Sequence, residues 1–358
     1  MLTLCVPTKD RSDFVGRLLR YCAEVRMPYR VMIGDASHPE HVQRTQATVR
    51  SVQSLVNVEH HLCPGLSSCA TLESLSRRIT TPYSVFLGDD DFLCPSGLKR
   101  CAEFLDAHPE YSAAHGEGLR FQTEGNGAQG AIGVVASYPQ AVISASTGAQ
   151  RLKEFFTASL YTLLYSVHRT ETWQAMFQGL SSLEGVQNRN MFKDELIAVS
   201  VSVIRGKVKA LPRLSLIHQV HEDSYRFPHV YDWIAHPSWY PSFQAFRQRL
   251  IDELIRQDGI SAEDASRVVA RVFWPYLARI IGDEWRKQRR GAPAAPSRLR
   301  VAAARIPAAR QAWRAVHQTF QRYHDPHSLA ALLRPSSRYA ADFLPVYRVA
   351  VATEWNGA

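Results

Sequence analysis

The sequence predicts an α/β fold, with a mixed, mostly parallel sheet, flanking helices and an all-helical C-terminal extension. Strand-like and helix-like segments alternate at short intervals over the first 120 residues, a pattern typical of a mostly parallel sheet. Several of these strands end in polar side chains, and beyond about residue 229 the alternation gives way to Arg- and Ala-rich helical segments. We therefore expect an α/β domain over residues 1–228 and a basic helical region over residues 229–358.

Hydrophobic periodicity assigns the first half of the expected domain. The first strand covers residues 2–6, and Ser12 is expected to cap a helix whose apolar residues recur at helical spacing. The elements that follow are strands at 30–34, 57–62 and 83–88, and helices at 39–55, 67–79 and 95–107. The strand at 83–88 is rich in aromatic and β-branched residues and ends at Gly, as expected of a buried strand that reaches the edge of its sheet.

The second half of the chain is less regular. Short strand candidates between residues 111 and 138 flank a polar loop at 124–130. The remaining expected elements are strands at 159–168, 207–211 and 214–218, and helices at 171–177, 191–204, 243–257, 262–282 and 298–320, with a basic linker at 286–293. Prolines and aromatic residues at 229–241 mark the expected boundary between the two units.

The net charge of +9 is confined to the C-terminal third. Residues 1–235 hold 23 Lys and Arg against 23 Asp and Glu, whereas residues 236–358 hold 19 against 10. Arg-rich helices that also carry Trp and Leu are typical of peripheral contact with an anionic membrane surface. A solvated helical cap and a contact in a homo-oligomer are the alternatives for residues 236–358.

Cysteine use and hydropathy favour a cytoplasmic location, with the inner face of the cytoplasmic membrane as the alternative. All six Cys lie in the first 101 residues without a Cys-x-x-Cys pair, so we expect buried free thiols rather than a structural zinc site. No apolar stretch reaches the roughly 18 residues of a membrane-spanning helix, and no signal peptide is expected.

The most informative segment is the run Asp89, Asp90 and Asp91, directly after the strand at 83–88. Two carboxylates about 4 Å apart repel by roughly 4 kcal/mol at an effective dielectric near 20, so the triplet needs a cation or hydrogen-bond donors. If the backbone stays extended, Asp89 and Asp91 point the same way and suit a Mg²⁺ or Mn²⁺ ion carried by a diphosphate. The alternative is a solvated acidic turn that caps the helix starting near Pro95.

Two further polar clusters are expected beside this triplet. Residues 8–11 follow the first strand, and Asp35 follows the second. Because ligands of open α/β sheets bind at the carboxyl ends of the strands, the three clusters predict one binding site. For Asp10 and Asp35 the alternative is a turn or cap residue at a strand end.

Three motifs together resemble family 2 type glycosyltransferases with the GT-A fold. They are LTLCVPTKDR at 2–11, IGDAS at 33–37 and FLGDDD at 86–91, in this order and at these spacings, and the resemblance covers residues 2–222. It implies a Rossmann-like GT-A domain that moves a sugar from a nucleoside diphosphate with inversion at the anomeric carbon. A UDP-sugar is the favoured donor, and a glycan or lipid-linked hydroxyl in bacterial polysaccharide or glycan synthesis is the expected acceptor.

The resemblance also assigns roles to residues at the three strand ends. The nucleotide pocket would be lined by Pro7, Thr8, Asp10, Arg11, Asp35, Asp89 and Asp90. Asp35 would contact the base or ribose, and Asp89 the ribose or a metal-bound water. Asp91 would ligate a Mn²⁺ or Mg²⁺ ion that stabilises the departing diphosphate. One departure is the Ser- and Cys-containing segment at 67–71, where many family members carry an Arg-Asn pair.

An inverting transfer also needs a base near the acceptor hydroxyl. Asp194 and Glu195, at the start of the apolar helix at 191–204, resemble the family's Glu-Asp pair with the order of the two acids reversed. Asp194 is favoured because it is the earlier residue of the helix's first turn, and Glu195 stays open. The alternative is a structural carboxylate that interacts with the positive end of the helix.

Two histidines follow the last expected strand. His218 is expected as a further metal ligand, since imidazole binds Mn²⁺ more readily than Mg²⁺, and His221 lies close by. For either histidine the alternative is an ordinary hydrogen-bonded or solvated side chain. Glu222, Asp223 and Ser224 could equally cap the next turn.

Two other functions compete with sugar transfer. A nucleotidyltransferase of related fold would need basic residues around a triphosphate, and the first loop offers only Lys9 and Arg11 without a Gly-rich phosphate loop. A nucleic-acid-binding protein would act through the basic C-terminal helices, but their cations are scattered and no recognised binding module is present. We therefore expect no nucleic-acid partner.

Overall fold

The computed structural model describes residues 1–125, 127–158, 163–187, 189–289 and 327–352. Its strands are β1 Leu2–Thr8, β2 Arg30–Asp35, β3 Val58–Leu62, β4 Tyr83–Phe86, β5 Phe92–Leu93, β6 Tyr111–Thr123, β7 Ile132–Ser137, β8 Val167–Arg169 and β9 Lys207–Gln219. They form one sheet in the order β3-β2-β1-β4-β8-β6-β9-β5, with β7 paired to β6. The four strands β3, β2, β1 and β4 are parallel, and β6 is parallel to β9, whereas the other pairings are antiparallel.

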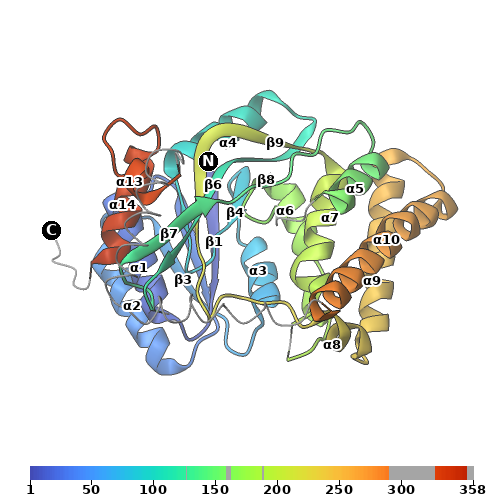
Figure 1. The fold of residues 1–358 in the computed structure, drawn as a ribbon, viewed down its shortest axis with the longest axis horizontal. Helices are drawn as coiled ribbons and strands as arrows, with labels where there is room; N and C mark the ends of the chain where they lie inside the picture. The colour runs from blue at the N-terminus through green and yellow to red at the C-terminus, as the bar shows by residue number, and fades with distance from the viewer. Residues whose placement is uncertain (126, 159–162, 188, 290–326, 353–358) are drawn as a thin grey trace, which may run out of the picture.

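Helices cover both faces of this sheet (Figure 1). They are α1 Ser12–Glu24, α2 Pro39–Val52, α3 Ser68–Ser76, α4 Pro95–Ala107, α5 Gly148–Thr157, α6 Thr170–Phe177, α7 Ile197–Arg205, α8 Val230–Ala235, α9 Trp239–Asp258, α10 Ala262–Arg289, α13 Leu329–Leu332 and α14 Ala340–Val351. A 3-10 turn covers Leu180–Ser182, and a π-helix at Phe192–Leu196 leads into α7. The predicted mixed sheet with flanking helices and a helical C-terminal region is confirmed.

Strand β1 lies between two hydrophobic clusters, and its alternating side chains enter them in turn. Leu4 and Val6 face the cluster formed with α1, α4 and α14. Cys5, between them, faces the cluster formed with α3, α6, α7, α9 and α10. Such a strand is buried on both faces, as expected for the parallel part of an α/β sheet. All six cysteines are buried and free, as the sequence predicts.

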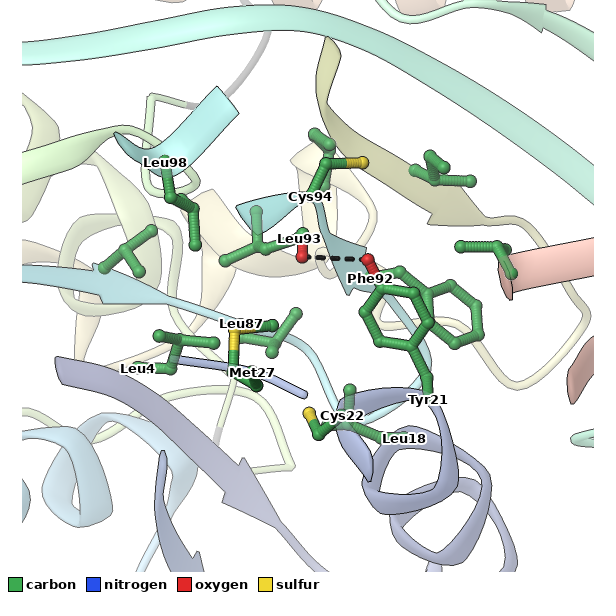
Figure 2. Close-up of a cluster of buried hydrophobic side chains, with 14 of the residues drawn as sticks. Leu4, Leu18, Tyr21, Cys22, Met27, Leu87, Phe92, Leu93, Cys94 and Leu98 are labelled. Carbon is green, nitrogen blue, oxygen red and sulfur yellow. Dashed lines mark hydrogen bonds between the residues drawn. The ribbon is translucent and has the colours of Figure 1, made fainter. Parts of the chain in front are cut away.

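The acidic triplet is anchored in the first of these clusters on both sides (Figure 2). Leu87 precedes it, and Phe92 and Leu93 follow it, each with no exposed surface. The Tyr21 hydroxyl of α1 donates a hydrogen bond to the Leu93 carbonyl at 3.1 Å. Three polar residues are thus held between two buried hydrophobic anchors, which fixes their position relative to α1.

Some expected elements differ from the structure. Ser12 does not cap α1: the cap position is Arg11, and the Ser12 hydroxyl is 2.9 Å from His41 Nδ1. The two strands expected at 207–211 and 214–218 are one strand, β9. Of the strand expected at 159–168, only its end lies in β8, and residues 159–162 lie outside the described residues.

The C-terminal region packs against the α/β part at two separate places. Helices α8, α9 and α10 share a hydrophobic cluster with α5, α6 and α7. Helix α14 instead packs beside α1, at the opposite side of the molecule (Figure 1). The first residues of the expected basic linker continue α10 to Arg289, and the helix expected at 298–320 lies outside the described residues. The domain boundary at 228/229, membrane contact and oligomer formation stay predictions.

Among the helices of the described residues, none combines the length and apolar character needed to span a membrane.

Candidate active site

Asp89, Asp90 and Asp91 form a turn rather than a continued strand. The Asp91 N–H donates to the Gly88 carbonyl at 3.1 Å, and the chain then enters β5, which pairs antiparallel to β9. The expectation that Asp89 and Asp91 point together was therefore wrong, because the backbone reverses between them. Asp89 and Asp90 lie together on one side, and all three residues are at least 93% buried.

One guanidinium joins the first two carboxylates. Arg11 Nη1 lies 2.7 Å from Asp89 Oδ1, and Arg11 Nη2 lies 2.8 Å from Asp90 Oδ2. The Thr8 hydroxyl donates to Asp89 Oδ2 at 2.7 Å, and His221 Nε2 lies 2.9 Å from Asp90 Oδ2. These donors, drawn from the ends of β1 and β9, offset the repulsion between the two carboxylates.

The pKa values of Asp89 and Asp90 are shifted in opposite directions. Burial raises the pKa of Asp89 to about 7, and the neighbouring charge of Asp90 adds to the rise, although Arg11 opposes it. For Asp90 burial also acts upward, but the hydrogen bond from His221 and the charge of Arg11 hold its pKa below the usual range.

Asp91 is turned away from Arg11 and is completely buried. Its Oδ2 accepts a hydrogen bond from the Tyr165 hydroxyl. Its Oδ1 lies 2.9 Å from His218 Nδ1 and accepts the Gln219 backbone N–H at 2.9 Å. Burial acts to lower the pKa of His218, but the adjacent Asp91 carboxylate raises it overall.

The proposed metal ligands do not form a coordination site as they are arranged here. Asp91 and His218 bind each other, and Asp89 is engaged by Thr8 and Arg11. In the described part of the chain, no group of three His, Cys, Asp or Glu side chains is placed to hold a metal ion. A metal-binding role for Asp89, Asp91 and His218 stays a prediction.

Asp10 links the end of β1 to the segment after β2, and Asp35 links the end of β2 to β3. Asp10 adopts a left-handed backbone conformation (φ 56°), and its Oδ1 accepts the His38 N–H at 2.8 Å. Asp35 Oδ1 accepts the Ser37 N–H at 2.9 Å, and its Oδ2 lies 2.8 Å from His60 Nε2. Burial acts upward on the pKa of Asp35, but the hydrogen bonds from His60 and Ser37 lower it overall.

These bonds match the turn-residue alternative for both carboxylates, and nucleotide binding by Asp10 and Asp35 stays a prediction. Pro7 and Thr8 lie on β1 opposite Gly34 and Asp35 of β2. The strand ends that the sequence predicts to converge therefore do lie side by side.

The candidate base lies on the π-helix before α7. Asp194 Oδ2 accepts the Asn190 backbone N–H at 2.7 Å and the Tyr225 hydroxyl. Burial raises the pKa of Asp194, although the Tyr225 hydrogen bond opposes the rise. A raised pKa suits a carboxylate that must accept a proton near neutral pH. Glu195 is half-buried beside it.

A short loop connects the acidic turn to this carboxylate. His221 contacts Asp90, and Tyr225, four residues later, donates to Asp194. Four residues of extended chain span at most about 14 Å, so the two anchoring Cα atoms lie within that distance. The sequence motif at 217–224 pointed to this segment through its histidines, but Tyr225 was missed.

Sequence reasoning also missed Tyr165 and Arg17. Tyr165 lies inside the strand expected at 159–168, and no sequence signal sets it apart from the other residues of that segment. Arg17 does have a signal, since it occurs among the buried positions of α1 between Val15 and Leu18. A charged residue on the apolar side of an amphipathic helix predicts a buried polar contact.

No known family model matches this chain, and no curated protein is similar to it in sequence. Several solved structures are similar to it. TarS from S. aureus has a TM-score of 0.49 and 15% identity, over 97% of this chain and 54% of TarS, so this chain spans about half of TarS. TarS 1–349 in complex with UDP-GlcNAc has a TM-score of 0.47 and 15% identity, over 97% of this chain and 90% of that one. Mannosyltransferase PcManGT from Pyrobaculum calidifontis, in complex with GDP-Man and Mn²⁺, has a TM-score of 0.42 and 12% identity, over 98% and 85%.

Proposed function

We propose that this chain is a glycosyltransferase that moves a sugar from a nucleoside-diphosphate sugar, with a UDP-sugar favoured, to a hydroxyl acceptor. The observation that carries the proposal is the loop that joins Asp90 to Asp194 through His221 and Tyr225. Because only four residues separate His221 from Tyr225, this loop supports one shared site for the donor beside Asp90 and the acceptor beside Asp194. The motifs at 2–11, 33–37 and 86–91 support the same function through their resemblance to GT-A glycosyltransferases.

The donor half of the site would consist of the ends of β1, β2 and β4. A departing nucleoside diphosphate gains negative charge in the transition state. Arg11 is the cation at this position, with a quarter of its side chain exposed. Its guanidinium can bind phosphate oxygens in place of a carboxylate, because both present paired acceptor oxygens. Asp35, bound to His60, would face the base or ribose.

The acceptor half would use Asp194. In an inverting displacement the acceptor oxygen attacks the anomeric carbon while the bond to the diphosphate breaks. Asp194 would take the hydroxyl proton, so that the oxygen carries no positive charge after attack. The Tyr225 hydroxyl and the Asn190 N–H both bind Oδ2 of Asp194, which leaves Oδ1 for the acceptor.

Dependence on Mn²⁺ or Mg²⁺ is part of the proposal. When bound, such a cation supplies charge stabilisation to the leaving diphosphate. Its binding would require Arg11 to release Asp89 and Asp90, because that guanidinium now bridges them. Bacterial polysaccharide or glycan synthesis at the cytoplasmic side of the membrane is the proposed setting.

A thermal-shift panel of nucleoside diphosphates and nucleotide-sugars, with and without Mn²⁺, tests the proposal. A ligand at about 100 times its Kd stabilises the native state by about 2.7 kcal/mol, which is readily measured. We expect stabilisation by one nucleoside diphosphate and its sugar conjugate. Stabilisation by triphosphates alone would favour a nucleotidyltransferase. Steeply salt-dependent binding of DNA or RNA, without any nucleotide-sugar effect, would favour a nucleic-acid-binding protein.

A further inference from the structure

Arg17 is a fully buried arginine directly behind the acidic turn. It lies on α1 with no exposed surface, and its guanidinium donates to three separate segments. Nη2 donates to the Asp90 carbonyl at 2.6 Å, and Nη1 donates to the Ala128 carbonyl at 2.5 Å. Nη1 also donates to Oε1 of Gln219. One side chain therefore connects the turn after β4, the loop between β6 and β7, and the end of β9.

Gln219 extends these contacts to the third carboxylate of the triplet. Its backbone N–H donates to Asp91 Oδ1, while its side-chain amide donates to Thr123 Oγ1 at 3.0 Å and to the Gly127 carbonyl at 3.3 Å. Arg17 thus holds the backbone of Asp90 directly and the carboxylate of Asp91 through Gln219. Both contacts are on the interior side of the turn.

The charge of Arg17 has no carboxylate as a direct hydrogen-bond partner among the contacts described. Its guanidinium carbon lies 4.7 Å from the ring centre of Phe92 and 5.3 Å from that of Phe14. Rings at these distances stabilise a cation through their faces. The positive charge therefore acts on the acidic turn without occupying the carboxylate oxygens, in contrast to Arg11, which binds two of them.

We propose that Arg17 is a positioning residue for the acidic turn: it fixes the backbone of the turn from behind and supplies charge there without using the carboxylate oxygens of Asp89 and Asp90, which stay available to Thr8, Arg11, His221 and ligand. The proposal rests on the proposed function only for the identity of that ligand. Arg17 does not touch the ligand itself, because every one of its hydrogen bonds is to main chain or to Gln219.

The chain contains a matched control. Arg151, on α5, is also buried (4% exposed) and donates to the carbonyls of Val203 at 2.7 Å and Ile204 at 2.5 Å. It secures the end of α7 and has no contact with the acidic turn. Arg17→Met and Arg151→Met each remove a guanidinium that donates to main-chain carbonyls at a buried position, so both will lower the Tm. Only the first removes contacts from the turn.

The experiment measures UDP binding by calorimetry, with and without Mn²⁺, in the wild-type chain, Arg17→Met, Arg17→Lys and Arg151→Met. We expect the Kd to rise at least tenfold in Arg17→Met and to stay within twofold of wild type in Arg151→Met. Arg17→Lys keeps the charge but not the three-way fork, so its Kd should lie between the two. It also serves as the test variant if Arg17→Met does not fold.

Hydrogen exchange of the ligand-free proteins gives a second readout. Peptides covering residues 88–93 and 123–131 should exchange faster in Arg17→Met or Arg17→Lys and not in Arg151→Met. Unchanged exchange in these peptides, or equal changes in the Arg17 and Arg151 variants, would overturn the proposal. If wild-type protein binds no nucleoside diphosphate, the proposed function fails, and the exchange data still decide the role of Arg17.

Discussion

Replacement of Asp194 by Asn tests the proposed base most directly. Both hydrogen bonds to this side chain are accepted by one oxygen, Oδ2, from Asn190 and Tyr225. The amide oxygen of Asn can accept the same two bonds, so the fold and the donor site should be preserved. What is lost is the ability to take a proton. We therefore expect kcat to fall while the donor KM stays within about threefold of wild type.

The size of the loss follows from the role. General-base catalysis by a positioned carboxylate contributes about 10²- to 10⁴-fold, which corresponds to about 2.7 to 5.4 kcal/mol in the activation free energy. The fall in kcat is measured as the rate of nucleoside-diphosphate release at saturating acceptor, with the product quantified by chromatography. Glu195→Gln is the control, because this residue is the alternative base. Full activity in both variants would refute the assignment of the base to this helix.

The pH profile gives a second check on the same carboxylate. Burial raises the pKa of Asp194 above its ordinary value, and only the deprotonated form accepts a proton. Activity should therefore rise with pH through a pKa above about 3.8, the ordinary value, and be lost as the pH falls through it. The Tyr225 hydroxyl stabilises the carboxylate, so Tyr225→Phe should move this acid limb to higher pH. An acid limb that is unchanged in Tyr225→Phe would contradict the contact's importance.

Four further substitutions have defined outcomes. Gly97→Ala should destabilise the fold by about 1–3 kcal/mol, because its Cβ would lie 2.2 Å from the Leu214 carbonyl oxygen. Gly16→Ala should instead stabilise the fold by about 0.5–1 kcal/mol, because its Cβ would meet no atom closer than 3.8 Å. Urea unfolding measures both changes in the free energy of unfolding. Phe192→Ala should cost about 3–5 kcal/mol in the same assay, since this ring is fully buried among aromatic side chains, and a loss below 1 kcal/mol would contradict its place in the core. If the Asp35 carboxylate accepts a hydrogen bond from the base or ribose, Asp35→Asn should weaken nucleoside-diphosphate binding about 10- to 100-fold, as measured by calorimetry. Unchanged affinity would leave Asp35 only its structural contacts with Ser37 and His60.

The parallel part of the sheet was predictable because its signals are local. Strands β1, β2 and β4 are short, mainly apolar runs with polar residues at or after their ends, and the structure places all four parallel strands within one or two residues of the expected positions. Their parallel pairing follows from the helices between them. The convergence of Thr8, Arg11 and the acidic triplet was therefore also predictable, since it depends on strand order and direction alone.

The orientation of the carboxylates was not predictable in the same way. Whether Asp89 and Asp91 share a side depends on one backbone turn, from Gly88 to Asp91, and that turn leads into β5, which pairs with β9 more than 120 residues later. Alternation along a strand gives no information once the strand has ended. Tyr225 was missed for a related reason: its partner, Asp194, is distant in sequence, and a lone tyrosine carries no pattern.

The packing of α14 has a practical consequence for work on this protein. Its Phe343 and Val346 are fully buried against the α1 side of the sheet, and the Ala350 carbonyl accepts the Gly130 N–H at 2.8 Å. Gly130 belongs to the same loop whose Ala128 carbonyl binds Arg17. A chain that ends before residue 327 would therefore lack α14, expose the apolar side chains that α14 covers, and lose the hydrogen bond that holds this loop. Because the loop also binds Arg17, we expect the deletion to weaken substrate binding near the start of α1.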